Sequence, residues 1–247
     1  MINRTPLAVC LLFATPILFA DSNGDGSGER STSAAFAEIK VTTEVERAVQ
    51  AIKQNGGRVS SADSDPHGPV VYVGFYPDQL GTDVGLKNIG ALKELIEIDL
   101  DRSEVTDVGL AYLRGFTDLQ HLDLSWTKVT DRGMKQLRLN SLQGLRALAL
   151  KSVPVTDAGV KEIVALKNLR GIDLSSTKVT DAGLKDLATL PLLHGLDLYD
   201  TKITNAGLMA LSKARLLQYV RVGNTGVTEA GIASFKRVLP GCEVDNH

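Results

Sequence analysis

The sequence predicts an α/β solenoid shaped as a horseshoe, with a parallel β-sheet on its concave face and helices on its convex face. The first observation behind this prediction is self-similarity, since LQHLDLSWTKVTDRGMKQL from Leu119 returns as LRGIDLSSTKVTDAGLKDL from Leu169. The second is a regular period, which is typical of stacked units that share one core. The copies begin at Leu95, Leu119, Leu145, Leu169, Leu193 and Leu217.

Each unit has the pattern of a short strand followed by a helix. In the copy from 119 onward, Leu122 and Leu124 lie two residues apart and share one face of a strand, while Asp123 points to the other. Thr130 is the predicted N-cap of the helix, and Asp131 adds negative charge to its first turn, where the helix dipole favours it. Because one unit cannot bury its own apolar face, neighbouring units are expected to share a continuous core.

The segments before these copies have other patterns. Residues 1–20 have one early charge, Arg4, then a short apolar run and a small residue at the end, which predicts a signal peptide and therefore export. Residues 21–35 are predicted to be a flexible acidic Gly/Ser linker. Residues 36–70 combine a helical and a strand pattern and are expected to cap the solenoid, and residues 71–247 to form the repeat domain with its C-terminal cap. After signal removal, no membrane span is expected.

The charge and the motifs exclude several functions. A formal net charge of -2 provides no basic field for nucleic acid. The sequence contains no GxSxG, HExxH, P-loop or dinucleotide fingerprint, and its histidines lie in different predicted elements without the spacing of a metal site. We therefore predict a protein that is not an enzyme, with no catalytic residues, no metal and no cofactor.

The repeat resembles the leucine-rich-repeat family, and is most similar to its cysteine-containing subclass and to secreted bacterial repeat proteins of the planctomycete type. The resemblance covers about residues 70–244 and implies the solenoid fold, but not a function. It also implies that RVLPGCEVD adds a final strand, with Cys242 half-buried in the cap. A hydroxyl in place of the family cysteine can still bond the turn backbone of the neighbouring repeat. The residues at that position are Ser103, Thr127, Thr177, Thr201 and Thr225, with Val153 as the exception.

Aspartates recur at the strand position that points away from the core. Stacked strands place equivalent residues ~5 Å apart, where two carboxylates repel by ~0.8 kcal/mol in water and ~3 kcal/mol at the effective dielectric of a protein surface. One interpretation is a receptor for a basic ligand, or a weak divalent-cation site. The other is a consensus surface residue that neighbouring hydroxyls and cations hold in place. The two pairs are Asp99 with Asp123 and Asp173 with Asp197.

Three aromatic residues depart from the repeat consensus on or beside the concave face. Tyr199 and Tyr219 belong to adjacent repeats, and together with Asp197 and Arg221 they form the predicted hot spot. The alternative is that Trp126 packs along the threonine column and the tyrosines cover backbone. The full set of predicted partner-binding residues is Glu97, Asp99, Asp101, His121, Asp123, Trp126, Asp173, Asp197, Tyr199, Tyr219 and Arg221.

These observations favour a protein–protein interaction module of an exported protein, which recognises a protein or peptide on its concave face. The acidic column makes a basic ligand one option. A structural or surface scaffold without a dedicated ligand is the alternative. Substrate-recognition repeats like those of F-box ubiquitin-ligase adaptors are a third, although nothing in residues 21–70 resembles an F-box. The sequence does not indicate an oligomeric state.

Overall fold

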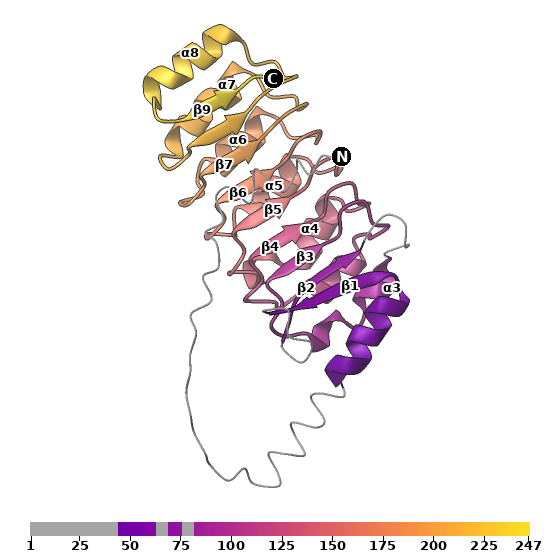
Figure 1. Ribbon diagram of the computed structural model, residues 1–247. Helices are drawn as coiled ribbons and strands as arrows, with labels where there is room; N and C mark the ends of the chain where they lie inside the picture. Colours follow the sequence, from indigo (N-terminus) through magenta and orange to yellow (C-terminus); the bar gives the residue numbers. More distant parts are fainter. Residues whose placement is uncertain (1–43, 63–68, 76–81) are drawn as a thin grey trace, which may run out of the picture.

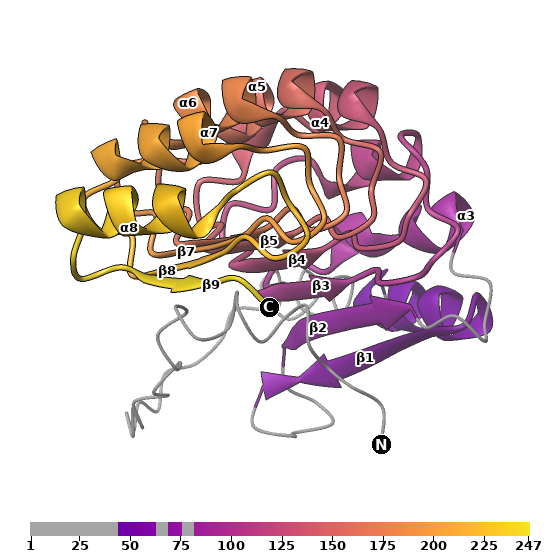
Figure 2. The ribbon, with the colours of Figure 1, turned by 90° about the horizontal axis from the view of Figure 1, so that it is seen from above.

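The computed structural model describes residues 44–62, 69–75 and 82–247. In this part of the chain, the strands form a single sheet in chain order. Figures 1 and 2 show the sheet as one layer, with the helices that follow the strands stacked as a second layer along one of its faces. The sheet is parallel from β2 onward, while β1 is antiparallel to β2. The strands are β1 (Gly57–Ser61), β2 (Val70–Phe75), β3 (Glu97–Asp99), β4 (His121–Asp123), β5 (Ala147–Ala149), β6 (Gly171–Asp173), β7 (Gly195–Asp197), β8 (Tyr219–Arg221) and β9 (Glu243–Asp245).

From β2 to β8, each strand is followed by a helical segment, so the predicted strand–helix unit is confirmed. Where the first of the six copies was expected to carry an α-helix, its helical segment is the 3-10 helix η4. The α-helices are α3 (Asp83–Leu86), α4 (Asp131–Leu137), α5 (Asp157–Ile163), α6 (Asp181–Leu187), α7 (Asn205–Ala210) and α8 (Glu229–Val238). The 3-10 helices are η3 (Ile89–Ala91), η4 (Gly109–Leu113), η5 (Leu139–Ser141) and η6 (Leu211–Lys213).

The core is one continuous column of apolar side chains between the sheet and the helices. The middle residue of each short strand points into it, as in Ile98, Leu122 and Leu148, all of which are buried. The register aligns these residues from strand to strand, because each strand pairs with the next without a shift from β3 to β9. The stacking of incomplete units predicted from the sequence is therefore what builds the interior.

An aspartate at the start of each helix binds the next repeat. Asp157 accepts hydrogen bonds from the backbone N–H of Thr180 (2.9 Å), from the Thr180 hydroxyl (2.6 Å) and from the backbone N–H of Gly183 (3.0 Å). A Cβ at Gly183 would lie 2.6 Å from the Asp157 carboxylate, which explains the glycine of the repeat. The equivalent Asp131 was expected to act on the helix dipole, but its hydrogen bonds form the same bridge to the next repeat, which we call the TD clamp.

The threonines at the family's cysteine position bond differently from the expectation. The hydroxyl of Thr177 donates to the carbonyl of Leu174 at 2.7 Å, three residues earlier in its own repeat, and Thr127 and Thr201 do the same. The expected bond to the neighbouring repeat is therefore wrong. The short reach of a hydroxyl explains this, because the turn carries its own carbonyl directly above the side chain.

Different structures close the two ends of the solenoid. Residues 44–54 are helical and precede β1, while the bounds of the predicted cap at 36–70 stay predictions. At the other end, α8 leads into β9, the expected final strand. Cys242 is buried rather than half-buried, and this burial raises the pKa of its thiol to about 12. The predicted signal peptide and linker lie outside the described residues, and no helix within the described ranges is long and apolar enough for a bilayer.

Candidate functional site

The face of the sheet opposite the helices carries the predicted binding residues. Because the middle residue of each short strand points into the core, its first and third residues point to this face, which we call the open face. Figure 2 shows the labelled helices on the other side of the sheet. The register places Glu97 beside His121, and Asp123 beside Asp99. Of the predicted set, Glu97, Asp99, His121, Asp123, Asp173, Asp197, Tyr219 and Arg221 lie in strands, whereas Asp101, Trp126 and Tyr199 lie in the turns that follow.

The aspartates of the open face cap their own strands. Asp123 accepts the backbone N–H of Ser125 at 2.7 Å, and Asp197 accepts that of Tyr199 at 2.9 Å. Asp173 accepts both the backbone N–H and the hydroxyl of Ser175, at 2.8 and 2.6 Å. This bond to the residue two positions later is an Asx turn. The recurrence of aspartate is therefore explained by turn geometry, as the second of the two interpretations of this column expected.

These carboxylates nevertheless remain electrostatically costly. Burial raises the pKa of Asp123 to about 7, and burial together with the nearby charge of Asp197 raises the pKa of Asp173 to about 6. The hydrogen bonds within the Asx turns lower both pKa values but do not offset the desolvation. The second interpretation is therefore right that neighbouring groups hold these side chains, but wrong that they lie at the surface, because Asp123, Asp173 and Asp197 are all buried.

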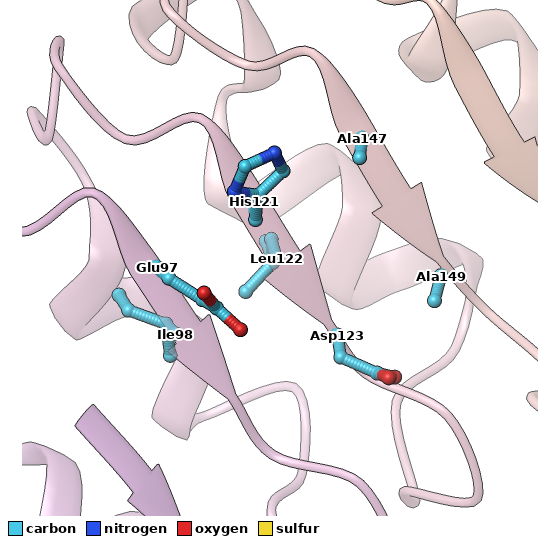
Figure 3. A pocket seen from close by; sticks show the side chains of 7 residues that line it. All are labelled: Glu97, Ile98, His121, Leu122, Asp123, Ala147 and Ala149. Atoms are coloured by element: carbon cyan, nitrogen blue, oxygen red, sulfur yellow. The ribbon is translucent and has the colours of Figure 1, made fainter. Parts of the chain in front are cut away.

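The aspartate row is interrupted at β5, and the interruption opens a pocket. Ala149 stands where its neighbours in the register, Asp123 and Asp173, carry carboxylates, and Ala147 stands beside His121. The resulting pocket is a small depression of about 10 Å³, enough for one water molecule, between these small residues on β5 and side chains from β3 and β4 (Figure 3). Its lining residues are Glu97, Ile98, His121, Leu122, Asp123, Ala147 and Ala149.

The residues of the predicted hot spot near the C-terminal end do lie together, but their groups are engaged with one another. The Arg221 guanidinium lies 3.4 Å from Asp197 and 3.7 Å from Asp245, and its centre stacks 4.4 Å from the centroid of the Tyr199 ring. Tyr219 donates its hydroxyl to Asp245 at 3.0 Å. Burial and this bond both raise the pKa of the Tyr219 phenol. The cluster therefore attaches β9 to the sheet, which leaves less of it available for a partner.

Trp126 has an unusual backbone and an exposed side chain. Its φ is 58°, in the left-handed region, and 49% of the residue is exposed. The same position has a positive φ in the other repeats, where it is occupied by Arg102, Ser152, Ser176, Asp200 and Asn224. This conformation lets the Trp126 N–H donate to Lys151 of the next repeat at 2.8 Å. The alternative that Trp126 packs along the threonine column does not fit its exposure.

Sequence reasoning missed two parts of this face. Asp245 lies in the cap segment EVD, which repeats the outward–inward–outward pattern of the strands and could have been added to the column on that signal. Ala147 and Ala149 differ in the sequence from the residues at the same strand positions of other repeats. Whether such small residues leave a pocket depends on the side chains around them, which an alignment of the repeats does not show. Within the described residues, no group of three or more His, Cys, Asp or Glu side chains could hold a metal ion.

Comparisons with known proteins agree with this architecture. The family model described as a leucine-rich repeat matches residues 117–137 and 165–188. Among solved structures, the chain is similar to internalin C2 from Listeria monocytogenes, with 22% identity, a TM-score of 0.57, and coverage of 71% of this chain and 70% of that one. No curated protein sequence matches the chain significantly. The fold is a leucine-rich-repeat solenoid.

Proposed function

We propose that this chain is a non-enzymatic recognition module of an exported protein, and that it binds a protein partner on the open face. The observation that carries the proposal is Trp126, an exposed indole in a backbone conformation that costs an ordinary L-residue roughly 1–2 kcal/mol. Asn224 serves the same turn in another repeat, and asparagine adopts this conformation at lower cost. A tryptophan here therefore works against stability, which is the expected mark of a residue kept for contact with another molecule.

The surroundings of Trp126 also suit a partner-binding role. Lys128, two residues later, pairs with Glu104 of the preceding repeat, so charged groups follow Trp126 in the sequence. Aromatic residues are enriched at protein interfaces.

Export is part of the proposal and has its support in the sequence alone. The apolar run after Arg4 and the small residue at position 20 are the features of a cleaved signal peptide. The subclass with cysteine-containing repeats and the planctomycete-type relatives likewise remain proposals, supported by the repeat motif.

Substitution of Trp126 tests the proposed function. The full chain, immobilised through a C-terminal tag, should capture a saturable partner from the extracellular fraction of its source. Trp126→Asn should weaken that capture at least tenfold, since a central aromatic anchor typically contributes 2 kcal/mol or more. The same variant should unfold at an equal or higher temperature than the wild type, because asparagine fits the left-handed turn.

A matched control separates recognition from folding. Ala158→Leu adds an exposed apolar group on α5, on the helix side of the solenoid, and should leave the capture unchanged. Absence of any saturable partner, or capture that Trp126→Asn leaves intact, would contradict recognition through Trp126 and favour a scaffold role.

A further inference from the structure

A row of side chains borders the open face at the edge where the strands begin. Each member is the residue just before a short strand, and backbone hydrogen bonds join neighbouring members. The N–H of Arg170 donates to the carbonyl of Arg146 at 2.8 Å, and the N–H of His194 donates to that of Arg170 at 2.8 Å. We call this row the basic edge, and its members from β4 to β8 are Gln120, Arg146, Arg170, His194 and Gln218.

The basic edge has no acidic residue beside it over four strands. The segments that lead into β5, β6, β7 and β8 contain four arginines or lysines and no aspartate or glutamate. The row of Asp173 and Asp197 lies three residues further along each strand, ~10 Å away at the rise of an extended chain, and both carboxylates are buried. The charge that the open face offers to a partner is therefore positive along this edge. The segments are residues 143–146, 167–170, 191–194 and 215–218.

The guanidinium of Arg170 has no internal partner. Within the described part of the chain, its side chain forms no hydrogen bond, ion pair or ring contact, although the residue is half-buried. Lys167, three residues earlier, instead donates to the carbonyl of Val164 at 2.7 Å. A guanidinium carries five N–H donors, so a half-buried one without an acceptor loses hydration that no protein group replaces.

The preceding repeat adds a second positive charge. Arg146 and Arg170 are neighbours on paired strands, where equivalent positions are ~5 Å apart. Burial, followed by the charge of Arg146, lowers the pKa of His121, so the field of Arg146 reaches the open face. Like charges at this spacing repel each other, and an anion placed between them would remove the repulsion while accepting hydrogen bonds from both.

Small residues follow the arginines in the strands. Ala147 follows Arg146 and pairs with Gly171, which follows Arg170 and pairs with Gly195. These three small residues are buried, so a partner meets the longer arginine side chains first. A glycine within a strand is also typical of a place that another backbone approaches closely. An extended peptide along this row presents alternate side chains ~7 Å apart, a spacing that flexible arginines of adjacent repeats can match.

We propose that Arg146 and Arg170 form an anion subsite for carboxylate side chains of an acidic segment of the partner protein. A guanidinium donates two parallel N–H bonds to the two oxygens of a carboxylate, and two arginines in a row suit successive carboxylates along a chain. This inference rests on the proposed function, since it assigns the chemistry of the partner. Trp126 belongs to the repeat before that of Arg146, to which its N–H donates through the carbonyl of Lys151.

The subsite can be tested without knowing the partner. N-acetyl-hexaglutamate amide is titrated into the isotope-labelled full chain, and backbone amide shifts are followed by NMR. Saturable shifts are expected at Arg146, Arg170 and Gly171, and binding should weaken at least fivefold between about 0.05 and 0.5 M salt because the charges are screened. N-acetyl-hexaglutamine amide has the same shape without the charge and should bind at least tenfold more weakly. Equal binding of the two peptides, or shifts confined to other residues, would overturn the proposal.

Inorganic phosphate distinguishes a second source of anions. It should produce weaker shifts than the peptide at the same concentration, because one compact ion cannot occupy successive arginines as a chain of carboxylates does. Phosphate that saturates Arg170 at a lower concentration than the peptide would overturn the assignment to an acidic protein segment.

A matched pair of arginine variants completes the test. Arg170→Gln removes the unpaired charge and should weaken hexaglutamate at least fivefold. Arg132→Gln makes the same change at an exposed position of α4, on the helix side, and should bind as the wild type does. Because the Arg170 guanidinium has no internal partner, Arg170→Gln should unfold at the same temperature as the wild type or at a higher one. A clearly lower unfolding temperature, or equal peptide affinity of the two variants, would overturn the proposal.

The outcome is separable from that of the proposed function. If a partner is captured through Trp126 but hexaglutamate does not bind, the recognition role stands and the anion subsite is wrong. If hexaglutamate binds at Arg170 but nothing is captured, the chemistry of the subsite is upheld and the recognition role fails. A captured partner should bind Arg170→Gln more weakly than the wild type, and an unchanged affinity there would refute the role of the subsite in recognition.

Discussion

At the scale of single residues, an aspartate of the open face can stabilise a turn through a hydrogen bond and still lower the stability of the fold through the burial of its charge. Asp123 closes its strand with a bond to Ser125, yet its carboxylate is almost completely removed from water. A hydrogen bond to a charged acceptor is worth about 1.5–3 kcal/mol, while desolvation of an ion costs several. The raised pKa of Asp123, about 7, indicates that desolvation is the larger of the two.

The raised pKa leads to a pH-dependent stability. Between the usual aspartate pKa near 4 and the folded value of about 7, the folded chain holds a proton that the unfolded chain has lost, so stability should fall as pH rises through this window. Asp123→Asn keeps the turn acceptor without the charge. At pH 8 this variant should melt at a higher temperature than the wild type, and its unfolding free energy should be larger by roughly 1 kcal/mol or more. The difference in unfolding free energy between the two proteins should be smaller at pH 5.

The comparison needs a carboxylate that is not buried. Asp118 is exposed, and Asp118→Asn should shift stability little at either pH. A gap between Asp123→Asn and the wild type that is the same at pH 5 and pH 8 would show that the carboxyl of Asp123 is not responsible.

At the scale of elements, the TD clamp joins each helix to the next. The aspartate at the start of one helix satisfies backbone donors that the N-terminus of the following helix leaves without a partner. The threonine, aspartate and glycine that recur in the repeats thus form a contact between two neighbouring copies rather than a feature of one copy. Glycine is required at its place because the carboxylate occupies the space of a side chain.

The chain contains its own comparison for the clamp. Asn205 replaces the aspartate in the last pair, where its amide oxygen accepts the Thr228 N–H at 2.9 Å and its amide nitrogen donates to the Thr228 hydroxyl at 3.0 Å. We therefore expect Asp157→Ala to lower the unfolding free energy by about 2 kcal/mol, since donors of Thr180 and Gly183 lose their acceptor. Asp157→Asn should lose less than half as much. Chemical denaturation measures both, and equal losses would mean that the amide cannot replace the carboxylate.

At the scale of the whole molecule, the stacked units produce one face that the helices do not cover. Arg221 and Tyr219 hold the C-terminal end of that face together, while near β4 the Nε2 of His121 has no hydrogen-bond partner among the described residues. We expect recognition to centre on the half of the face that contains Trp126.

The proposed export also concerns the whole chain. Expressed in a bacterial host with its secretion machinery intact, the full chain should be recovered with Asp21 as its first residue. Leu12→Arg places a charge in the apolar run and should leave the chain unprocessed. Mass spectrometry of both proteins decides the question, and a wild type that retains residues 1–20 would exclude a cleaved signal.

The sequence by itself determined the solenoid, because the repeat period and the alternation around Leu122 and Leu124 state which side chains must be buried together. It also placed Asp197, Tyr199, Tyr219 and Arg221 in one neighbourhood. Only the tertiary structure decided that this neighbourhood is self-paired, that the aspartates cap turns, and that Ala149 leaves a pocket. The physical reason is that periodicity fixes the row and the face of a residue, whereas pairing, burial and empty space depend on the atoms of the adjacent strands.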